Sequence, residues 1–147
     1  MTRILIGKPR RKYKPYVVFN GHIDELNSQL GMVKVLADQE LKTEIDRIQN
    51  RLIEIMGNVA REFMEPLDLK GDIGFFEKKI DEYRELYPEQ NSFVTPGESE
   101  ISARIHVARA VARRAERALG PIIRDDGVPD DVTAVSYTHL RAHETGV

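Results

Sequence analysis

Residues 104–117, RIHVARAVARRAER, decide how the rest of the chain must fold. The stretch places five arginines and one glutamate among alanine, valine and isoleucine residues. At about 100° per residue, a helix built from it carries one narrow polar stripe, while small or apolar residues occupy most of the remaining circumference. A helix of this kind needs neighbours on more than one side. The stripe consists of Ser102, His106, Arg109, Arg113 and Glu116.

Further segments carry helical apolar periodicity, and no stretch keeps the alternation of a strand. Asn20 is a plausible N-cap, whereas Pro9 and Pro15 argue against a helix in residues 1–19, which we interpret as an N-terminal arm. The arginine helix is expected to begin near Glu98 and to end at Gly120, a natural C-terminal cap. The other helices are expected at about residues 21–37, 39–64, 73–88 and from 129 onward.

Length and composition limit the class of protein. A chain of 147 residues with 41% hydrophobic and 31% charged residues suits one domain, so we expect residues 1–147 to form a single all-α, antiparallel helical bundle. The net charge of -2 argues against nucleic acid as a partner, and the absence of cysteine excludes thiolate metal sites. No apolar run approaches the roughly 20 residues that cross a bilayer. We therefore expect a cytoplasmic protein without a membrane partner.

The arginine stripe has two interpretations. Periodicity alone favours a solvated surface of weak ion pairs, such as Arg113 with Glu116. However, Arg109 and Arg113 lie one turn apart and repel each other unless an anion or a carboxylate lies between them. In a helix packed on both flanks, such guanidinium groups are poorly solvated and need an acidic or phosphate partner. The second interpretation is therefore a buried anion site.

The segment GHIDELNSQLG, residues 21–31, offers a carboxylate for that site. Asp24, Asn27, Ser28 and Gly31 form a polar stripe of small residues. A glycine inside a helix costs roughly 1 kcal/mol relative to alanine, so Gly31 indicates the close approach of a helix or a ligand. Asp24 is either an ordinary acid that favours the helix dipole or the partner of Arg109.

Two other features have both an ordinary and a functional interpretation. The basic stretch GKPRRKYK, residues 7–14, is either a solvated tail or an arm that closes over polyphosphate. Phe93 either staples the helix that follows it or presents an apolar wedge to a ligand. The histidines, including His139 and His143 one turn apart, have no convincing metal spacing, so no protein-held metal is expected.

Taken together, these stretches resemble the PduO-type ATP:cob(I)alamin adenosyltransferases. NGHIDELNSQLG is similar to the family segment G-[TDH]-[IVT]-D-E-L-N-S-x-[IL]-G, and FVTPGESEISARIHVARAVARRAER is similar to the family block that contains R-x-x-x-R-R-A-E-R. GKPRRK matches the family's G-x-R-V-x-K in position, with Lys12 on its lysine. The resemblance covers roughly residues 2–125 in the expected order.

This resemblance implies a transferase that moves the 5′-deoxyadenosyl group of ATP to the cobalt of a reduced corrinoid, cob(I)alamin, and releases triphosphate. It implies a five-helix bundle, a homotrimer with active sites between subunits, and Mg²⁺ with the ATP. The implied ATP site contains Lys12, Arg113, Arg114, Glu116 and Arg117, with Arg113 as the leading phosphate contact.

The resemblance also implies a corrinoid side of the site. Asp24 and Arg109 would form a salt bridge across the subunit boundary beside the corrinoid, and Phe93 would press on the lower face of the corrin. The implied catalytic set is therefore Arg109, Arg113 and Asp24.

The sequence departs from the family at three places. The phosphate loop T-G-D-x-G-T, expected before residue 2, is missing, and Glu98 replaces the second glycine of P-G-G-[ST]. Residues 138–147, THLRAHETGV, lack the apolar period of the family's last helix and look like a non-native tail, so we expect that helix to be incomplete and both stability and turnover to be reduced. Alternative functions are a non-catalytic corrinoid- or nucleotide-binding trimer and, from the basic arm alone, a nucleic-acid-binding bundle.

Overall fold

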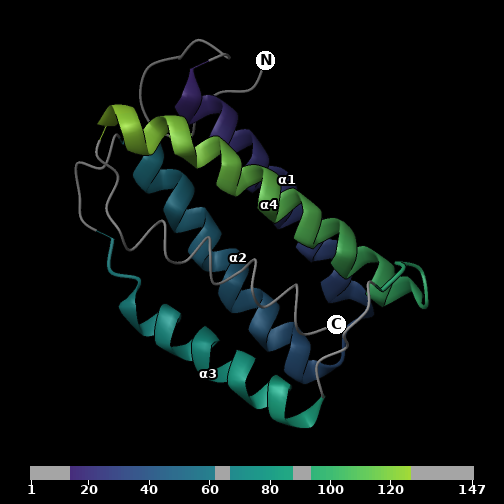
Figure 1. The fold of residues 1–147 in the computed structure, drawn as a ribbon. Coiled ribbons are helices and arrows are strands. Elements are labelled where there is room, and N and C mark those ends of the chain that lie inside the picture. The colour runs from purple at the N-terminus through teal and green to yellow at the C-terminus, as the bar shows by residue number, and fades with distance from the viewer. Residues whose placement is uncertain (1–13, 62–66, 88–93, 127–147) are drawn as a thin grey trace.

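The computed structural model describes residues 14–61, 67–87 and 94–126, with side chains up to Ile122. These residues form four α-helices and no strand: α1 (Pro15–Leu36), α2 (Gln39–Ala60), α3 (Lys70–Leu86) and α4 (Glu100–Asp126) (Figure 1). The expected all-α class is confirmed. A fifth helix, expected from Pro129, and the expected tail lie outside the described residues.

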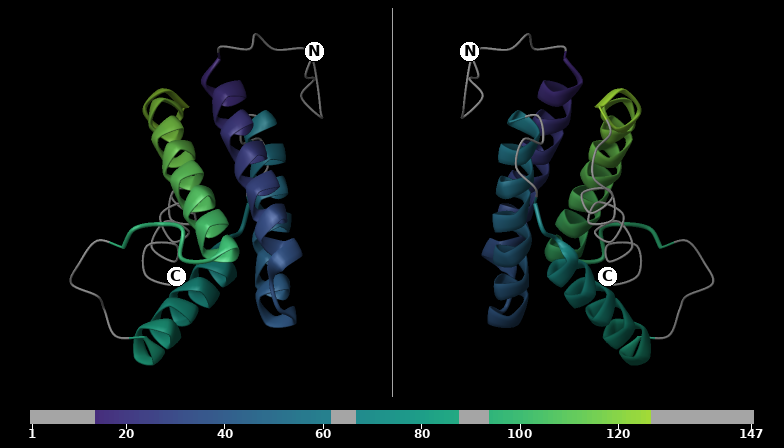
Figure 2. Two further views of the ribbon diagram at one scale, coloured as in Figure 1. Left: turned by 90° about the vertical axis from the view of Figure 1, so that its right-hand side faces the viewer. Right: turned by 90° about the vertical axis from the view of Figure 1, so that its left-hand side faces the viewer.

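Consecutive helices run antiparallel, as expected. Asn20 near the start of α1 donates to the Met56 carbonyl oxygen near the end of α2, at 3.1 Å. Lys34 near the end of α1 pairs with Asp46 in the first half of α2, at 2.8 Å. Helix α4 lies along the other side of α1, whereas α3 splays away from these three helices (Figures 1 and 2).

One apolar core joins α1, α2 and α4. Its side chains recur at the helical spacing seen in the sequence, and burying each large one contributes roughly 1.5–3 kcal/mol. The largest apolar side chains that are almost fully buried are Phe19, Val33, Leu52, Ile55, Val59, Leu69, Leu119 and Ile122. No helix among the described residues is long and apolar enough to cross a membrane.

Helix α1 begins earlier than the sequence predicts. Pro15 is the first helical residue and Lys14 is the N-cap, so residues 15–19 belong to the helix rather than to an arm. Proline fits this position because its missing N–H would have no partner in the first turn and its φ is already helical. Phe19 is completely buried and fixes this first turn in the core. The interpretation of Asn20 as the N-cap is therefore wrong.

Helix α4 continues through the point where the sequence predicts its end. Gly120 and Pro121 lie inside the helix, which extends to Asp126. A proline inside a helix costs about 3 kcal/mol. Leu119 and Ile122 on either side of the Gly-Pro pair are 1% and 0% exposed, and their burial offsets this cost. Packing, rather than local propensity, sets the helix length here.

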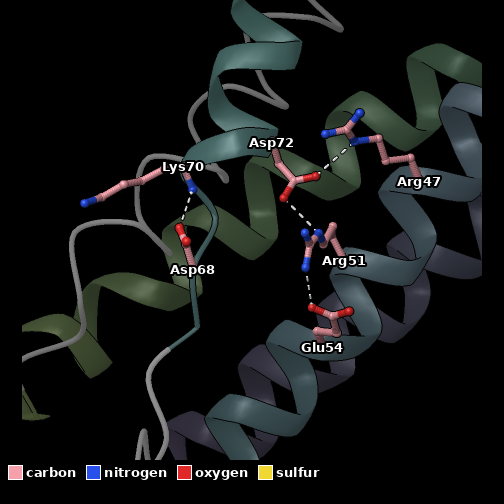
Figure 3. A network of polar contacts seen from close by, with 6 residues as sticks. All are labelled: Arg47, Arg51, Glu54, Asp68, Lys70 and Asp72. Carbon is pink, nitrogen blue, oxygen red and sulfur yellow. Dashed lines mark hydrogen bonds and ion pairs between the residues drawn. The ribbon is translucent and has the colours of Figure 1, made fainter.

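Helix α3 is joined to α2 by several polar contacts, and the most buried of these involve a carboxylate, while Lys79 and Tyr83 of α3 also contact Glu44 of α2. Asp72 is 1% exposed, and its two oxygens lie 3.0 Å from Arg47 Nε and 2.8 Å from Arg51 Nε (Figure 3). Arg51 also pairs with Glu54 at 2.6 Å, and the Arg47 guanidinium lies 3.9 Å from the centre of a phenylalanine ring, that of Phe75. The hydrogen bond with Glu54 and the nearby Asp72 raise the pKa of Arg51.

Candidate functional site

The two adjacent arginines of α4 serve different surfaces. Arg114 points to α1, where its Nη2 pairs with the Glu25 carboxylate and its Nε donates to His22 Nδ1 at 3.2 Å. Arg113, about 100° further around the helix, lies on the flank that is turned away from these α1 residues. Arg113 and Arg117 are exposed, and Glu116 is half-buried. One chain therefore presents Arg113 and Arg117 at its surface.

Asp24 and Arg109 do not meet within one chain. Asp24 is exposed on the side of α1 opposite the core residue Leu26, and Arg109 is half-buried on α4. Between the described residues no ion pair joins them. His106, on the same stripe as Arg109, has both ring nitrogens buried without a hydrogen-bond partner among the groups that the structure describes. The arginine stripe is therefore not closed into a buried anion site within a single chain.

The polar stripe expected on α1 is divided between two environments. The Asn27 carbonyl oxygen accepts from Gln49 Nε2 of α2 at 3.1 Å, whereas Asp24 and Ser28 are exposed. A methyl group added at Gly31 would meet Gln49 Nε2 at 3.6 Å, which is an ordinary contact. The close approach that Gly31 indicates is therefore no tighter than normal packing within the chain. Its neighbour there is a flexible side chain.

Two expected contacts fall on parts of the chain that the structure does not describe. Lys12, the expected second phosphate contact, and Phe93, the expected wedge below the corrin, both lie outside the described residues. The described residues contain no group of three or more histidine, aspartate or glutamate side chains that could hold a metal ion.

His22 and Glu25 are partners of the arginine helix that were not predicted from the sequence. A helix that starts at about residue 21, as the sequence predicts, would have Asp24 and Glu25 close to its first turn as ordinary acids. The helix begins six residues earlier, at Pro15, so neither acid lies in its first turn. Residues 22 and 25 are three apart and share one helix face. A histidine and a glutamate on one helix face, together with the many arginines of α4, are the sequence signal that could have predicted this contact.

His22 makes the junction between α1 and α4 sensitive to pH. Burial, and then the positive charges of Arg114 and Arg117, lower the pKa of His22 below its ordinary value. Below about pH 6.5 the unfolded chain therefore binds a proton that the folded chain resists, and stability falls as the pH falls through this window. Protonation also removes the acceptor for Arg114 Nε.

We expect the free energy of unfolding to decrease from about pH 7.5 to about pH 5.5, and His22→Asn to reduce that decrease. The asparagine oxygen can replace Nδ1 as an acceptor but cannot be protonated in this range. Urea unfolding at both pH values measures the effect. An identical pH dependence in the variant and the parent would contradict the assignment to His22.

The fold is a helical bundle in which Arg113 and Arg117 of α4 are exposed. The chain belongs to the cobalamin adenosyltransferase family, whose model matches residues 1–138. A corrinoid adenosyltransferase of Bacillus subtilis is 32% identical over 138 residues, which are 87% of this chain and 70% of that protein. The corrinoid adenosyltransferase PduO of Salmonella typhimurium is 32% identical over 124 residues, and the match covers 80% of this chain but only 37% of that longer protein.

Solved structures give the same result for the fold. A variant of a PduO-type ATP:corrinoid adenosyltransferase from Lactobacillus reuteri, complexed with cobalamin and ATP, matches with a TM-score of 0.82 and 28% identity. The match covers 97% of this chain and 85% of that one. A second variant from the same organism, complexed with ATP, matches with a TM-score of 0.82 and 30% identity over 97% of this chain and 86% of that one.

Proposed function

We propose that this chain transfers the 5′-deoxyadenosyl group of ATP to the cobalt of a reduced corrinoid, with triphosphate as the leaving group. The observation that carries the proposal is the surface of α4, where Arg113 and Arg117 are exposed in a chain that matches the family over residues 1–138. Fixed guanidinium groups suit this reaction because negative charge develops on the departing triphosphate.

In this proposal Arg113 and Arg117 bind the phosphates, and Lys12 reaches them from the N-terminal side. A guanidinium offers two parallel donors to a phosphate, so Arg113 both binds and orients it. Mg²⁺ enters with the nucleotide, whose phosphate oxygens are the hard ligands it prefers. Attack at C5′ requires the cobalt and the ribose carbon in line, so much of the catalytic effect comes from positioning.

The proposed assembly is a homotrimer with the corrinoid bound between subunits. Asp24 faces away from the core of its own chain and does not meet Arg109 there, so a salt bridge between the two requires a second chain. The same contact would cover the arginine stripe and remove it from water. Phe93 is proposed to contact the lower face of the corrin, where it keeps the lower ligand off the cobalt and makes reduction easier. We place the reaction in the cytoplasm, which supplies ATP.

The test is a turnover assay with chemically reduced cob(I)alamin, ATP and Mg²⁺. We expect adenosylcobalamin and triphosphate to form in equal amounts, and to form only when both substrates are present. Binding of ATP or corrinoid without any product would favour the non-catalytic alternative. If the chain binds neither substrate, the proposed function is wrong.

A further inference from the structure

The contacts of Arg114 occupy the edge of its guanidinium that recognises anions. The Nε and Nη2 atoms form the edge that gives carboxylates and phosphates two parallel hydrogen bonds. In this chain His22 accepts from Nε at 3.2 Å, and Glu25 pairs with Nη2. Both partners belong to α1, so this edge faces the chain's own helix.

We infer that Arg114 is a positioning residue of the ATP site, held on α1 by Glu25 and His22, and that it is not itself a phosphate contact. The inference rests on the proposed function and refines it. A phosphate would have to displace the Glu25 carboxylate to reach the same edge of Arg114. Glu25 also neutralises the charge of Arg114, which weakens the attraction of this guanidinium for phosphate.

Arg114 acts on the phosphate contacts through the rotation of α4. A helix is stiff, and the side chain of Arg113 lies about 100° around the helix from that of Arg114. Arg117 lies about one turn beyond Arg113. The buried face of α4 sets its rotation, and the contacts of Arg114 with two α1 side chains restrict it further at the position of Arg113 and Arg117. Release of Arg114 would let α4 rotate slightly, and small misplacements of binding groups are costly.

The decisive variants are Glu25→Gln and Arg114→Met, alone and combined. If Arg114 positions the helix, Glu25→Gln weakens ATP binding by about tenfold, Arg114→Met does the same, and the double variant is no weaker than either. If Arg114 instead binds phosphate, Glu25→Gln removes a competing carboxylate and ATP binds as tightly as before or tighter. The two roles thus predict opposite signs for one substitution.

The measurement is the Kd for ATP, by calorimetric titration of the full chain. Glu100→Gln is the matched control because it removes the same charge from another glutamate–arginine pair, Glu100 with Arg104 at 3.2 Å, and it should leave the Kd within about twofold. Irreversibly unfolded protein lowers the fraction of binding sites without changing the Kd. A reversible unfolding equilibrium raises the apparent Kd as the folded fraction falls, so urea unfolding must first show that each variant is almost fully folded under the titration conditions.

The outcomes separate the inference from the proposed function. A parent chain that binds no ATP overturns both. A parent that binds ATP with an unchanged or lower Kd in Glu25→Gln overturns only the positioning role. Additive losses in the double variant also overturn it, because they would mean that Glu25 and Arg114 act independently.

Discussion

Replacement of Arg113 by alanine is expected to weaken ATP binding and to lower kcat/KM by about a hundredfold or more. Arg113 is exposed on the flank of α4 that Arg114 does not occupy, and it is the proposed leading phosphate contact. Charge-assisted, two-pronged hydrogen bonds to phosphate are among the strongest that a side chain makes. Calorimetric titration with ATP and steady-state turnover measure the loss.

A matched control lies on the same helix. Arg104 pairs with Glu100 and its Nη1 lies 3.4 Å from the sulfur of Met32, so Arg104→Ala removes the same charge without touching the proposed phosphate site. Its effect on the Kd for ATP should stay within about threefold, as for an exposed charge acting at a distance. The loss of ATP affinity in Arg113→Lys should fall between those of Arg104→Ala and Arg113→Ala, because lysine keeps the charge but lacks the planar guanidinium that gives two parallel hydrogen bonds. Equal losses for Arg104→Ala and Arg113→Ala would show that only net charge matters.

Replacement of Asp72 by alanine is expected to lower the free energy of unfolding by about 2–3 kcal/mol. Asp72 is 1% exposed and accepts from one arginine while it pairs with a second, so its removal leaves Arg47 and Arg51 with like charges side by side. These arginines are 40% and 33% exposed, and solvent reduces their repulsion, which keeps the loss below that of a fully buried pair.

The control is Asp46→Ala. Asp46 pairs with Lys34 at 2.8 Å, but its side chain is 56% exposed, so its loss should cost less than about 1 kcal/mol. Urea unfolding compares the two variants. Hydrogen exchange should also rise in α3 more than in α1 and α4, because Asp72 joins α3 to α2. If Asp72→Ala is no less stable than Asp46→Ala, the buried carboxylate does not stabilise the contact between α3 and α2.

The sequence predicts the helices and the core well, because apolar spacing is a local signal. Apolar spacing predicts helix α3 and the start of α2. It does not predict the start of α1 or the end of α4, each of which contains a proline. Pro15 argues against a helix and Gly120 predicts a helix end, yet Pro15 fits the first turn of α1. Helix α4 continues through Gly120 and Pro121 because Leu119 and Ile122 are buried. These outcomes depend on packing from distant segments, which no local pattern contains.

Only part of the candidate site can be predicted from the sequence. Helical angles place the side chains of Arg113 and Arg114 about 100° apart, but they cannot say which neighbour each one meets. The link from Arg114 to Glu25 joins residues that are 89 apart, and the pairing of Arg47 with Asp72 joins residues that are 25 apart. Such contacts arise from the antiparallel register of the helices. Three contacts stay predictions: the salt bridge between Asp24 and Arg109, the phosphate contact of Lys12 and the corrin contact of Phe93.

The most direct test of the account is a crystal structure of the full chain with ATP and Mg²⁺. It should place the phosphates within hydrogen-bond distance of Arg113 and Arg117, at a subunit boundary where Asp24 of one chain meets Arg109 of another, with Arg114 still on Glu25. Nucleotide bound elsewhere on the chain, or phosphates held by Arg114 while Arg113 stays in solvent, would contradict it.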